Sequence, residues 1–318
     1  MDTEEQLMLV RNLAAIGVNE VRLTGGEPTT RHDLIDLIDE AIALGLFITL
    51  GTNGTFSDQV LESLCSRDLG RFLISLEGVQ QVHDALRGAG NFDRAVGTIR
   101  RLLAAGRNVR INTVLCRKNL KCLSAFLTWC AGIGVRNMSL IVPRPLGRAG
   151  SPPFNADIPA PHELKAVARI VASLGPELGV HIEFQYDVYR PRSSPVSADP
   201  VISKVLSCPA GTEAAFVSPE GLMYSCGCAA EWLSNVRLRQ HVLAGSVRNL
   251  QARSIWDLWQ HAPVWGIFRN PMGCKDSACF TCVHYGNGCF GSCPIHAFAS
   301  SGSFSAPDPM CWLRGASD

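Results

Sequence analysis

Helical and strand-like patterns of hydrophobic residues alternate along the first half of the chain. Residues 3–17 have helical spacing, an acidic start and a glycine stop, and residues 18–26 are then predicted to form a short buried strand. Further helices are predicted over 32–45, 56–70, 91–106, 120–134 and 161–175. Further strands are predicted over 46–54, 71–78, 108–116, 135–143 and 180–189. Continuous runs rich in Val, Ile and Leu are typical of parallel strands covered on both faces, so the pattern predicts an α/β fold with a parallel sheet or barrel.

Small and polar residues follow the predicted strands. These segments read TGGEP (24–28), GTNG (51–54), SLEG (75–78), NTVL (112–115) and PRPLGRAG (143–150). The carboxyl ends of parallel strands meet at one edge, where α/β folds bind their ligands. Each segment alone is equally typical of an ordinary turn. Together they favour a ligand held across the strand ends.

Changes in composition divide the chain into three predicted regions. The alternating pattern occupies residues 1–150. A Pro-rich linker begins a bridging region, 151–204, which contains one helix, one strand and a second Pro-rich loop. Residues 205–318 are rich in cysteine, and we expect them to form a small domain of their own.

The overall charge excludes some classes of function. The 318 residues include 29 Lys and Arg against 28 Asp and Glu, a formal net charge of +1. Binders of nucleic acids or membrane surfaces show a basic excess instead. No stretch reaches the ~18 apolar residues of a membrane helix, and the start, MDTEEQLMLV, lacks a signal peptide's basic segment. We therefore expect a cytoplasmic protein without nucleic-acid or membrane partners.

Nine of the thirteen cysteines lie between positions 208 and 311. Clustered cysteines in a reducing compartment hold metal more often than they form disulfides. The region reads Cys208-x12-Gly221-x4-Cys226, then Cys279-x2-Cys282-x6-Cys289-x3-Cys293, and finally Cys311. The segment FVSPEGLMYSC predicts a hairpin that ends at Cys226. Structural zinc and iron–sulfur clusters both take four thiolates, and the spacing alone leaves both possibilities open.

Two sets of motifs resemble a known superfamily. LTGGEPTTRHDL, GTNGT, ISLEG, HDALRGAGNFDRAV and PRPLGRAG, in this order, resemble the radical S-adenosylmethionine (radical SAM) enzymes. The cysteine-rich region resembles their SPASM auxiliary-cluster domain, with six residues rather than five between Cys282 and Cys289. The resemblance implies a partial (β/α)6 TIM-like barrel that lacks its first strand, followed by a small α+β SPASM domain.

The resemblance also implies how the GGEP segment binds SAM. Gly25 and Gly26 would let the backbone approach the methionine end closely, because a Cβ would block it. Glu27 would accept a charge-assisted hydrogen bond from the SAM ammonium, and Pro28 would fix the turn.

Three further positions match the family's SAM contacts at other strand ends. Ser75 and Asn112 match positions that contact the carboxylate and the ribose. Asn53, at the end of another predicted strand, fits a SAM contact and an Asn-Gly turn equally well. The sequence identifies no catalytic acid or base.

Eight cysteines are implied as ligands of two auxiliary [4Fe-4S] clusters. The distal cluster would take Cys279, Cys282, Cys289 and Cys311. The proximal cluster would take Cys208, Cys226 and Cys293. Its fourth ligand is either Cys228 or an open position for substrate.

The family's defining C-x3-C-x2-C motif, which chelates SAM through a further cluster, does not occur in this sequence. Cys289-x3-Cys293 is followed at the right distance by His296, but both cysteines are already assigned to the auxiliary clusters. The chain is then either a truncated version of an active enzyme or a degenerate relative without radical chemistry. We favour truncation, because the other motifs are intact, and expect the chain as given not to cleave SAM.

The resemblance implies a maturase of a peptide or protein side chain, acting through hydrogen abstraction by the 5′-deoxyadenosyl radical. Its cofactors would be SAM and [4Fe-4S] clusters, and its electron donor a reductant such as flavodoxin or ferredoxin. Two alternatives remain. One is a radical SAM dehydrogenase of a small molecule, and the other is a non-catalytic protein that binds clusters or recognises a peptide.

Overall fold

The computed structural model describes residues 1–144, 147–152, 154–188, 205–231, 240–269, 277–285, 289, 291 and 293–311. The chain forms two compact units. The first unit comprises Met1–Ile141, Ser173–Ile182 and Asn249–Ile255, and the second comprises Val142–Ala172, Glu183–Arg248 and Trp256–Asp318.

Helices and strands alternate along the first unit as predicted, except that two short helices, Gln80–Arg87 and Arg117–Leu120, were not predicted. Its strands are β1 (Glu20–Leu23), β2 (Phe47–Thr52), β3 (Arg71–Ser75), β4 (Val109–Val114) and β5 (Asn137–Ile141). Its helices are α1 (Thr3–Ala15), α2 (Leu34–Ala43), α3 (Asp58–Cys65), α4 (Gln80–Arg87), α5 (Asn91–Ala104), α6 (Arg117–Leu120) and α7 (Leu123–Gly132), with a 3₁₀ turn, η1 (Pro28–Thr30), after β1.

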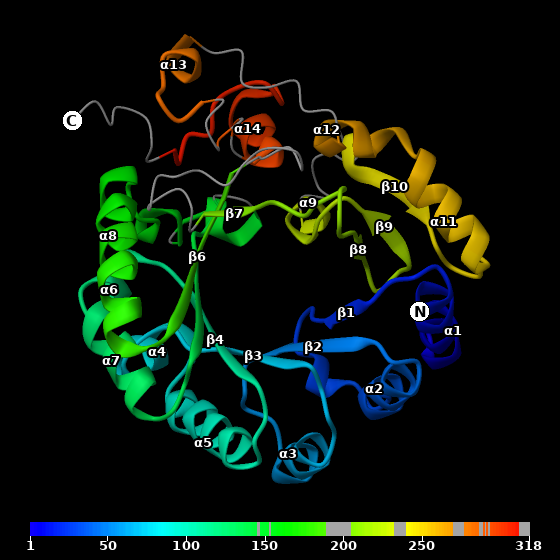
Figure 1. Ribbon diagram of the computed structural model, residues 1–318, viewed down its shortest axis with the longest axis horizontal. Helices are drawn as coiled ribbons and strands as arrows, with labels where there is room; N and C mark the ends of the chain where they lie inside the picture. The colour runs from blue at the N-terminus through cyan, green and yellow to red at the C-terminus, as the bar shows by residue number, and fades with distance from the viewer. Residues whose placement is uncertain are drawn as a thin grey trace. The chain divides into compact units, whose positions relative to one another are not determined.

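The strands of the first unit pair in parallel. Each pairs with the next along the chain, from β1 with β2 to β4 with β5. Helices α2, α3 and α5 follow one another along one side of these strands (Figure 1). The central positions of β2, β3 and β5 are buried, which explains why their apolar runs are continuous rather than alternating. The prediction of a parallel α/β fold is confirmed.

Local capping accounts for several helix starts. Asp2 accepts the amide of Glu5, and the Glu5 side chain accepts the amide of Asp2, which forms a capping box at the start of α1. At α5 the carboxylate of Asp84 accepts the amides of Gly90 and Phe92, at 3.0 and 2.8 Å. These bonds satisfy amides that the first turn of a helix leaves unpaired.

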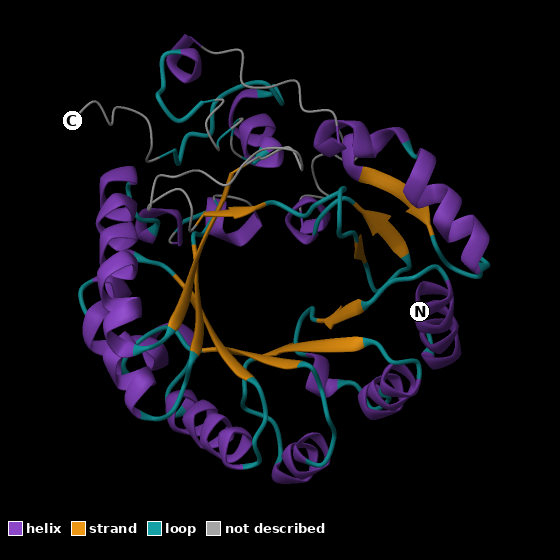
Figure 2. Cartoon of the chain, viewed as in Figure 1, coloured by secondary structure: helices purple, strands orange, loops and turns teal. Residues whose placement is uncertain are grey.

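Three elements contain residues of both units, and two of them are in the bridging region. Helix α8 (Pro161–Leu178) and strand β6 (His181–Val188) match the predicted helix and strand of the bridging region. The order of strands in the sheet is β1-β2-β3-β4-β5-β6-β7 (Figure 2). The short strand β7 (Val205–Ser207), parallel to β6, was not predicted.

The second unit contains short elements. They are the 3₁₀ turns η2 (Gly147–Gly150), η3 (Phe154–Asp157) and η5 (Pro263–Trp265), the strands β8 (Phe216–Val217), β9 (Leu222–Tyr224) and β10 (Leu243–Ser246), and the helices α9 (Gly227–Glu231), α11 (Ala252–His261), α12 (Gly266–Arg269), α13 (Ser277–Phe280) and α14 (Pro294–Ser301). Helix α11 begins in the first unit. The predicted hairpin is confirmed, since β8 and β9 are antiparallel and the amide of Gly221 donates to the carbonyl of Ser218.

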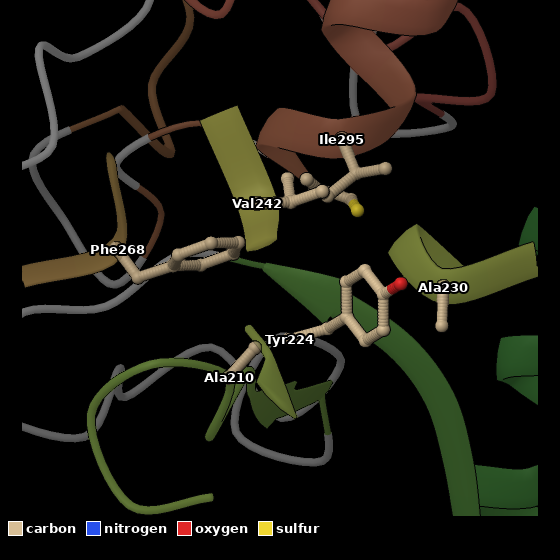
Figure 3. Packing of buried hydrophobic residues seen from close by; sticks show 7 residues of the cluster. Ala210, Tyr224, Ala230, Val242, Phe268 and Ile295 are labelled. Atoms are coloured by element: carbon tan, nitrogen blue, oxygen red, sulfur yellow. The ribbon is translucent and has the colours of Figure 1, made fainter. Parts of the chain in front are cut away.

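A small hydrophobic cluster holds the second unit together (Figure 3). Its buried members are Ala210, Tyr224, Ala230, Val242, Phe268, Cys293 and Ile295. Figure 3 draws their side chains, among them Tyr224 of β9, Ile295 of α14 and Val242, which directly precedes β10. Within the described residues, no helix of either unit has the length and apolar character needed to cross a membrane.

Candidate functional site

The GGEP segment forms the loop that leaves β1. Gly25 has a φ of +143°, which side-chain-bearing residues rarely adopt, so this position requires glycine. Gly26 has an ordinary φ, and a Cβ built on it would have no atom within 4 Å. The protein itself would therefore accept a side chain at Gly26, and the open space beside this backbone is available to a ligand.

The Glu27 carboxylate connects the loop after β1 with the loop after β2. Its Oε1 accepts the amide and hydroxyl of Thr29, at 3.2 and 2.7 Å, and the hydroxyl of Thr52 at 2.7 Å. Its Oε2 accepts the amide of Asn53 at 2.8 Å. A carboxylate has about four lone-pair sites, two on each oxygen. Oε2 therefore keeps the capacity to accept a hydrogen bond from a bound cation.

Asn53 shapes its own turn. Its Oδ1 accepts the amide and the hydroxyl of Thr55, both at 2.8 Å, and the next residue, Gly54, has a φ of +74°. A Cβ on Gly54 would lie 3.0 Å from Cγ2 of Ile74. The turn role that the sequence allowed for Asn53 is thus present, alongside the contact of its amide with Glu27.

A row of polar side chains crosses the sheet at one level. Ser75 on β3 pairs in register with Asn112 on β4, and Asn112 pairs with Ser139 on β5. Residues in register on neighbouring parallel strands point to the same face, about 4.8 Å apart. Oδ1 of Asn112 is buried and accepts no hydrogen bond from any described residue. An unpaired buried acceptor of this kind fits a hydroxyl or amide donor on a ligand.

Sequence reasoning missed two polar residues at these strand ends. Ser139 is fully buried, and only the register with Asn112 places it in the row. Glu77, in the SLEG segment, is buried, pairs with Arg87, and accepts the amide of Val114 at 2.7 Å. Burial raises the pKa of the Glu77 carboxyl, while Arg87 acts in the opposite direction. An acidic residue within an apolar strand end was the available signal.

The three cysteines expected to hold the proximal cluster lie around the hydrophobic cluster of the second unit. Cys293 is one of its buried members, and Cys208 and Cys226 pack against it. Cys228, the candidate fourth ligand, is exposed. Burial raises the pKa of the Cys293 thiol, whereas the Arg144 guanidinium lowers it.

The cysteines expected to hold the distal cluster lie in two turns. The amide of Cys282 donates to the carbonyl of Cys279, and Tyr285 and Cys289 form an isolated β-bridge. Cys311 follows a separate turn, in which its amide donates to the carbonyl of Asp308 at 3.1 Å. All eight predicted ligands are described, and in the described part of the chain no three His, Cys, Asp or Glu residues form a group that could hold a metal ion.

Comparisons with known proteins agree with the resemblance. Residues 1–130 match the model of the radical SAM superfamily. The mycofactocin maturase MftC of Mycobacterium tuberculosis is 28% identical over 321 residues, which cover 100% of this chain and 76% of the maturase. An AdoMet-dependent heme synthase of Oleidesulfovibrio alaskensis is 27% identical over 98% of this chain and 79% of its own length.

The fold is also similar to a solved structure. Streptococcus suis SuiB, in the crystal structure bound to the precursor peptide SuiA, superposes with a TM-score of 0.71 at 15% identity, over 98% of this chain and 69% of SuiB. Residues 1–130 thus match the radical SAM superfamily, and the relatives that span the whole chain and the parallel α/β fold agree with that match.

Proposed function

We propose that this radical SAM enzyme is a maturase that modifies a peptide or protein side chain, with SAM bound at the strand ends of the first unit and two auxiliary clusters in its cysteine-rich region, residues 205–318. The observation that carries the SAM site is the row of Ser75, Asn112 and Ser139 with the unpaired Oδ1 of Asn112. Reductive cleavage of SAM would supply the 5′-deoxyadenosyl radical. It requires the cluster of the C-x3-C-x2-C motif, which this sequence lacks, so we expect the chain as given to bind SAM without cleaving it.

Each residue of the site has a distinct part in binding SAM. The backbone at Gly25 and Gly26 lies along the methionine end, where no Cβ intervenes. Oε2 of Glu27 accepts from the ammonium, because Oε1 is already used by Thr29 and Thr52. Pro28, which is buried, begins the 3₁₀ turn after the loop and fixes the position of Glu27.

The other polar groups hold the far parts of the same ligand. Ser75 donates its hydroxyl to the carboxylate, and Asn112 accepts from a ribose hydroxyl at Oδ1. Asn53 stabilises the turn next to Glu27 and donates the NH₂ of its side-chain amide to the ligand.

The cysteine-rich region provides two sets of thiolates. Cys279, Cys282, Cys289 and Cys311 hold the distal [4Fe-4S] cluster, and Cys208, Cys226 and Cys293 hold the proximal one. The convergence of Cys208 and Cys226 on the hydrophobic cluster that contains Cys293 supports the second assignment. Such clusters require a reducing compartment and an electron donor, which we propose to be the cytoplasm and a flavodoxin or ferredoxin.

Two of the similar proteins support a peptide substrate. MftC is named as a mycofactocin maturase, and SuiB was crystallised with a precursor peptide. The heme synthase favours the second candidate, a radical enzyme that oxidises a small molecule. Screening the reconstituted protein for binding of short peptides encoded beside its gene separates the two, because a small-molecule enzyme would bind none of them.

The decisive measurement is the metal content of the 318-residue chain after anaerobic reconstitution. Two four-iron clusters predict about eight irons with matching sulfide. One or two zinc ions without iron would make the cysteine-rich region a structural zinc fold and would overturn the auxiliary clusters.

SAM binding tests the site in the first unit separately. By calorimetry, Asn112→Ala should weaken SAM binding about tenfold, because one hydrogen bond to a buried acceptor is lost. Thr113→Val is the matched control, since its side chain lies on the opposite face of β4 and donates to the carbonyl of Leu76. A wild-type chain that takes up iron but has no affinity for SAM would favour the non-catalytic alternative.

A further inference from the structure

A buried histidine lies three residues after Cys293 on helix α14. His296 has no exposed surface. Its Nδ1 lies 2.7 Å from Oδ1 of Asp308, which is itself 2% exposed. Oδ2 of Asp308 lies 3.7 Å from a guanidinium nitrogen of Arg144. The second unit therefore contains a chain of three ionisable side chains, Arg144–Asp308–His296, of which Asp308 and His296 are buried, near a predicted cluster ligand.

Both ring nitrogens of His296 lack a hydrogen bond within the described residues. Nδ1 faces Asp308 Oδ1 at close range but is not aligned with it as a hydrogen-bond donor. Nδ1 therefore has a carboxylate oxygen close by, whereas Nε2 has no hydrogen-bond acceptor or donor among the described residues. A buried nitrogen without a partner is costly, so Nε2 is suited to a group that is bound to the protein.

The surroundings of the ring match those of a metal-ligating histidine. Such histidines almost always direct the second ring nitrogen at a carboxylate, a backbone carbonyl or a water molecule, which fixes the tautomer and orients the ring. Here Asp308 provides the carboxylate. Arg144 lies near the same carboxylate, and a ring nitrogen that carries no proton is the one that can bind a metal.

The position of His296 relative to Cys293 points to the proximal cluster. Cys293 is the residue before the first turn of α14, and His296 lies three residues later. Residues three apart on a helix occupy the same face.

We infer that Nε2 of His296 is the fourth ligand of the proximal cluster, completing the thiolates of Cys208, Cys226 and Cys293. This inference rests on the proposed function, because it requires an iron–sulfur cluster at these cysteines. Histidine replaces cysteine as a ligand in some iron–sulfur proteins and raises their reduction potential. His296 is the better candidate than Cys228, because the ring is fully buried while Cys228 is exposed.

Asp308 extends the effect of this ligand to the other cluster. The amide of Met310 donates to Oδ1 of Asp308 at 2.8 Å, and the amide of Cys311 donates to its backbone carbonyl. The same residue therefore orients His296 and shapes the turn that presents Cys311 to the distal cluster. Asp308 is a positioning residue for both ligand sets.

Pulsed electron paramagnetic resonance of the reduced, reconstituted chain tests the ligand directly. Protein labelled with ¹⁵N-histidine should show a strong hyperfine coupling from one imidazole nitrogen, and His296→Ala should abolish it. His241→Ala is the matched control, since the His241 ring packs on Phe298 of the same helix without being a proposed ligand; it should keep the coupling.

A second variant distinguishes loss of a ligand from loss of the fold. His296→Cys should restore about eight irons per chain, remove the nitrogen coupling and lower the potential of one cluster, because a thiolate adds negative charge. Two outcomes would overturn the ligand assignment alone. In the first, the wild-type chain contains iron but shows no nitrogen coupling. In the second, Cys228→Ser loses one cluster while His296→Ala keeps both. A wild-type chain with zinc and no iron would overturn the proposed clusters and this inference together.

Discussion

The two proposed sites of this chain consist of different chemical groups. In the first unit, backbone amides and short polar side chains at strand ends bind one another, as in the four hydrogen bonds that the Glu27 carboxylate accepts. In the second unit, the proposed site consists of thiols at a small hydrophobic cluster and of an Arg–Asp–His chain. The first site is therefore preorganised by the protein, whereas the second depends on what it binds.

The two cores explain this difference. Strands β2 to β5 bring fully buried side chains such as Leu50, Phe72 and Ile111 into a continuous sheet core. A core of that kind stabilises its loops without a ligand. Short elements around a small cluster bury much less apolar surface, and metal binding commonly supplies the missing folding free energy in such regions.

Removal of the metal should have the largest effect on stability, and this effect should differ between the two units. Chelation of iron from the reconstituted chain should increase amide exchange in β9 and α14 by about three orders of magnitude, or about 4 kcal/mol, because cluster binding contributes directly to folding there. Exchange in β2, β3 and β4 should stay unchanged. Hydrogen exchange followed by mass spectrometry measures both. Equal loss of protection in the two units would contradict the comparison.

The second largest effect should come from the ion pair that supports the first unit. Glu77→Ala should lower the free energy of unfolding by about 3 kcal/mol, since it leaves Arg87 and the amide of Val114 without their buried carboxylate. The value is at the low end of the range for buried pairs, because the Arg87 side chain is 38% exposed. Urea unfolding followed by circular dichroism measures it.

Glu62→Ala is the matched control for this carboxylate. The Glu62 side chain is 73% exposed and lies 3.6 Å from Arg101, so its loss should change stability by less than about 0.5 kcal/mol. Similar costs for the two substitutions would show that the buried network does not stabilise the strand ends.

Much of the fold was predictable, because hydrophobic periodicity determines it. Strands β2, β3 and β5 have buried central positions in an unbroken row, and all six strands from β1 to β6 were predicted. The hairpin at Cys226 followed from the turn residues PEG. Strand β7 was not predictable, because it has three residues and exists only through pairing with β6.

The candidate site was predictable only where a motif carried it. The resemblance supplied Gly25, Gly26 and Glu27 as SAM-binding positions, and their roles remain proposals. Ser139 and the partners of Glu77 escaped notice because register and burial define them, and neither is visible in a single sequence. His296 and Asp308 are separated by a turn between α14 and the last cysteine, so their contact could not be predicted from the sequence.

Acid should weaken the first unit through the start of α2. The Arg31 guanidinium, helped by the hydroxyl of Thr3, lowers the pKa of Asp33 to about 2 although burial acts against it. A lowered folded-state pKa stabilises the protein above the unfolded value near 3.9, and this stability is lost as pH falls toward 2. The loss should be about 1–2 kcal/mol, reduced by the exposure of Arg31.

Substitution of either partner tests this acid response. Asp33→Asn and Arg31→Gln should both flatten the dependence of unfolding free energy on pH between about 4 and 2, measured by urea titration at each pH. An unchanged slope in Arg31→Gln would show that the guanidinium is not the cause.

The smallest effect on stability should come from the two adjacent glycines in the loop after β1, where SAM is proposed to bind, and it should differ between them. Gly25→Ala should lower the free energy of unfolding by about 1 kcal/mol, because its φ of +143° strains any side chain. Gly26→Ala should leave stability unchanged, because its Cβ meets no atom within 4 Å. Calorimetry should nevertheless show SAM binding weakened at least about tenfold in Gly26→Ala, because the methyl group occupies space that the ligand needs. Unchanged SAM affinity in Gly26→Ala would mean that the backbone of this loop does not lie against the ligand. The site in the first unit would then not be preorganised for SAM.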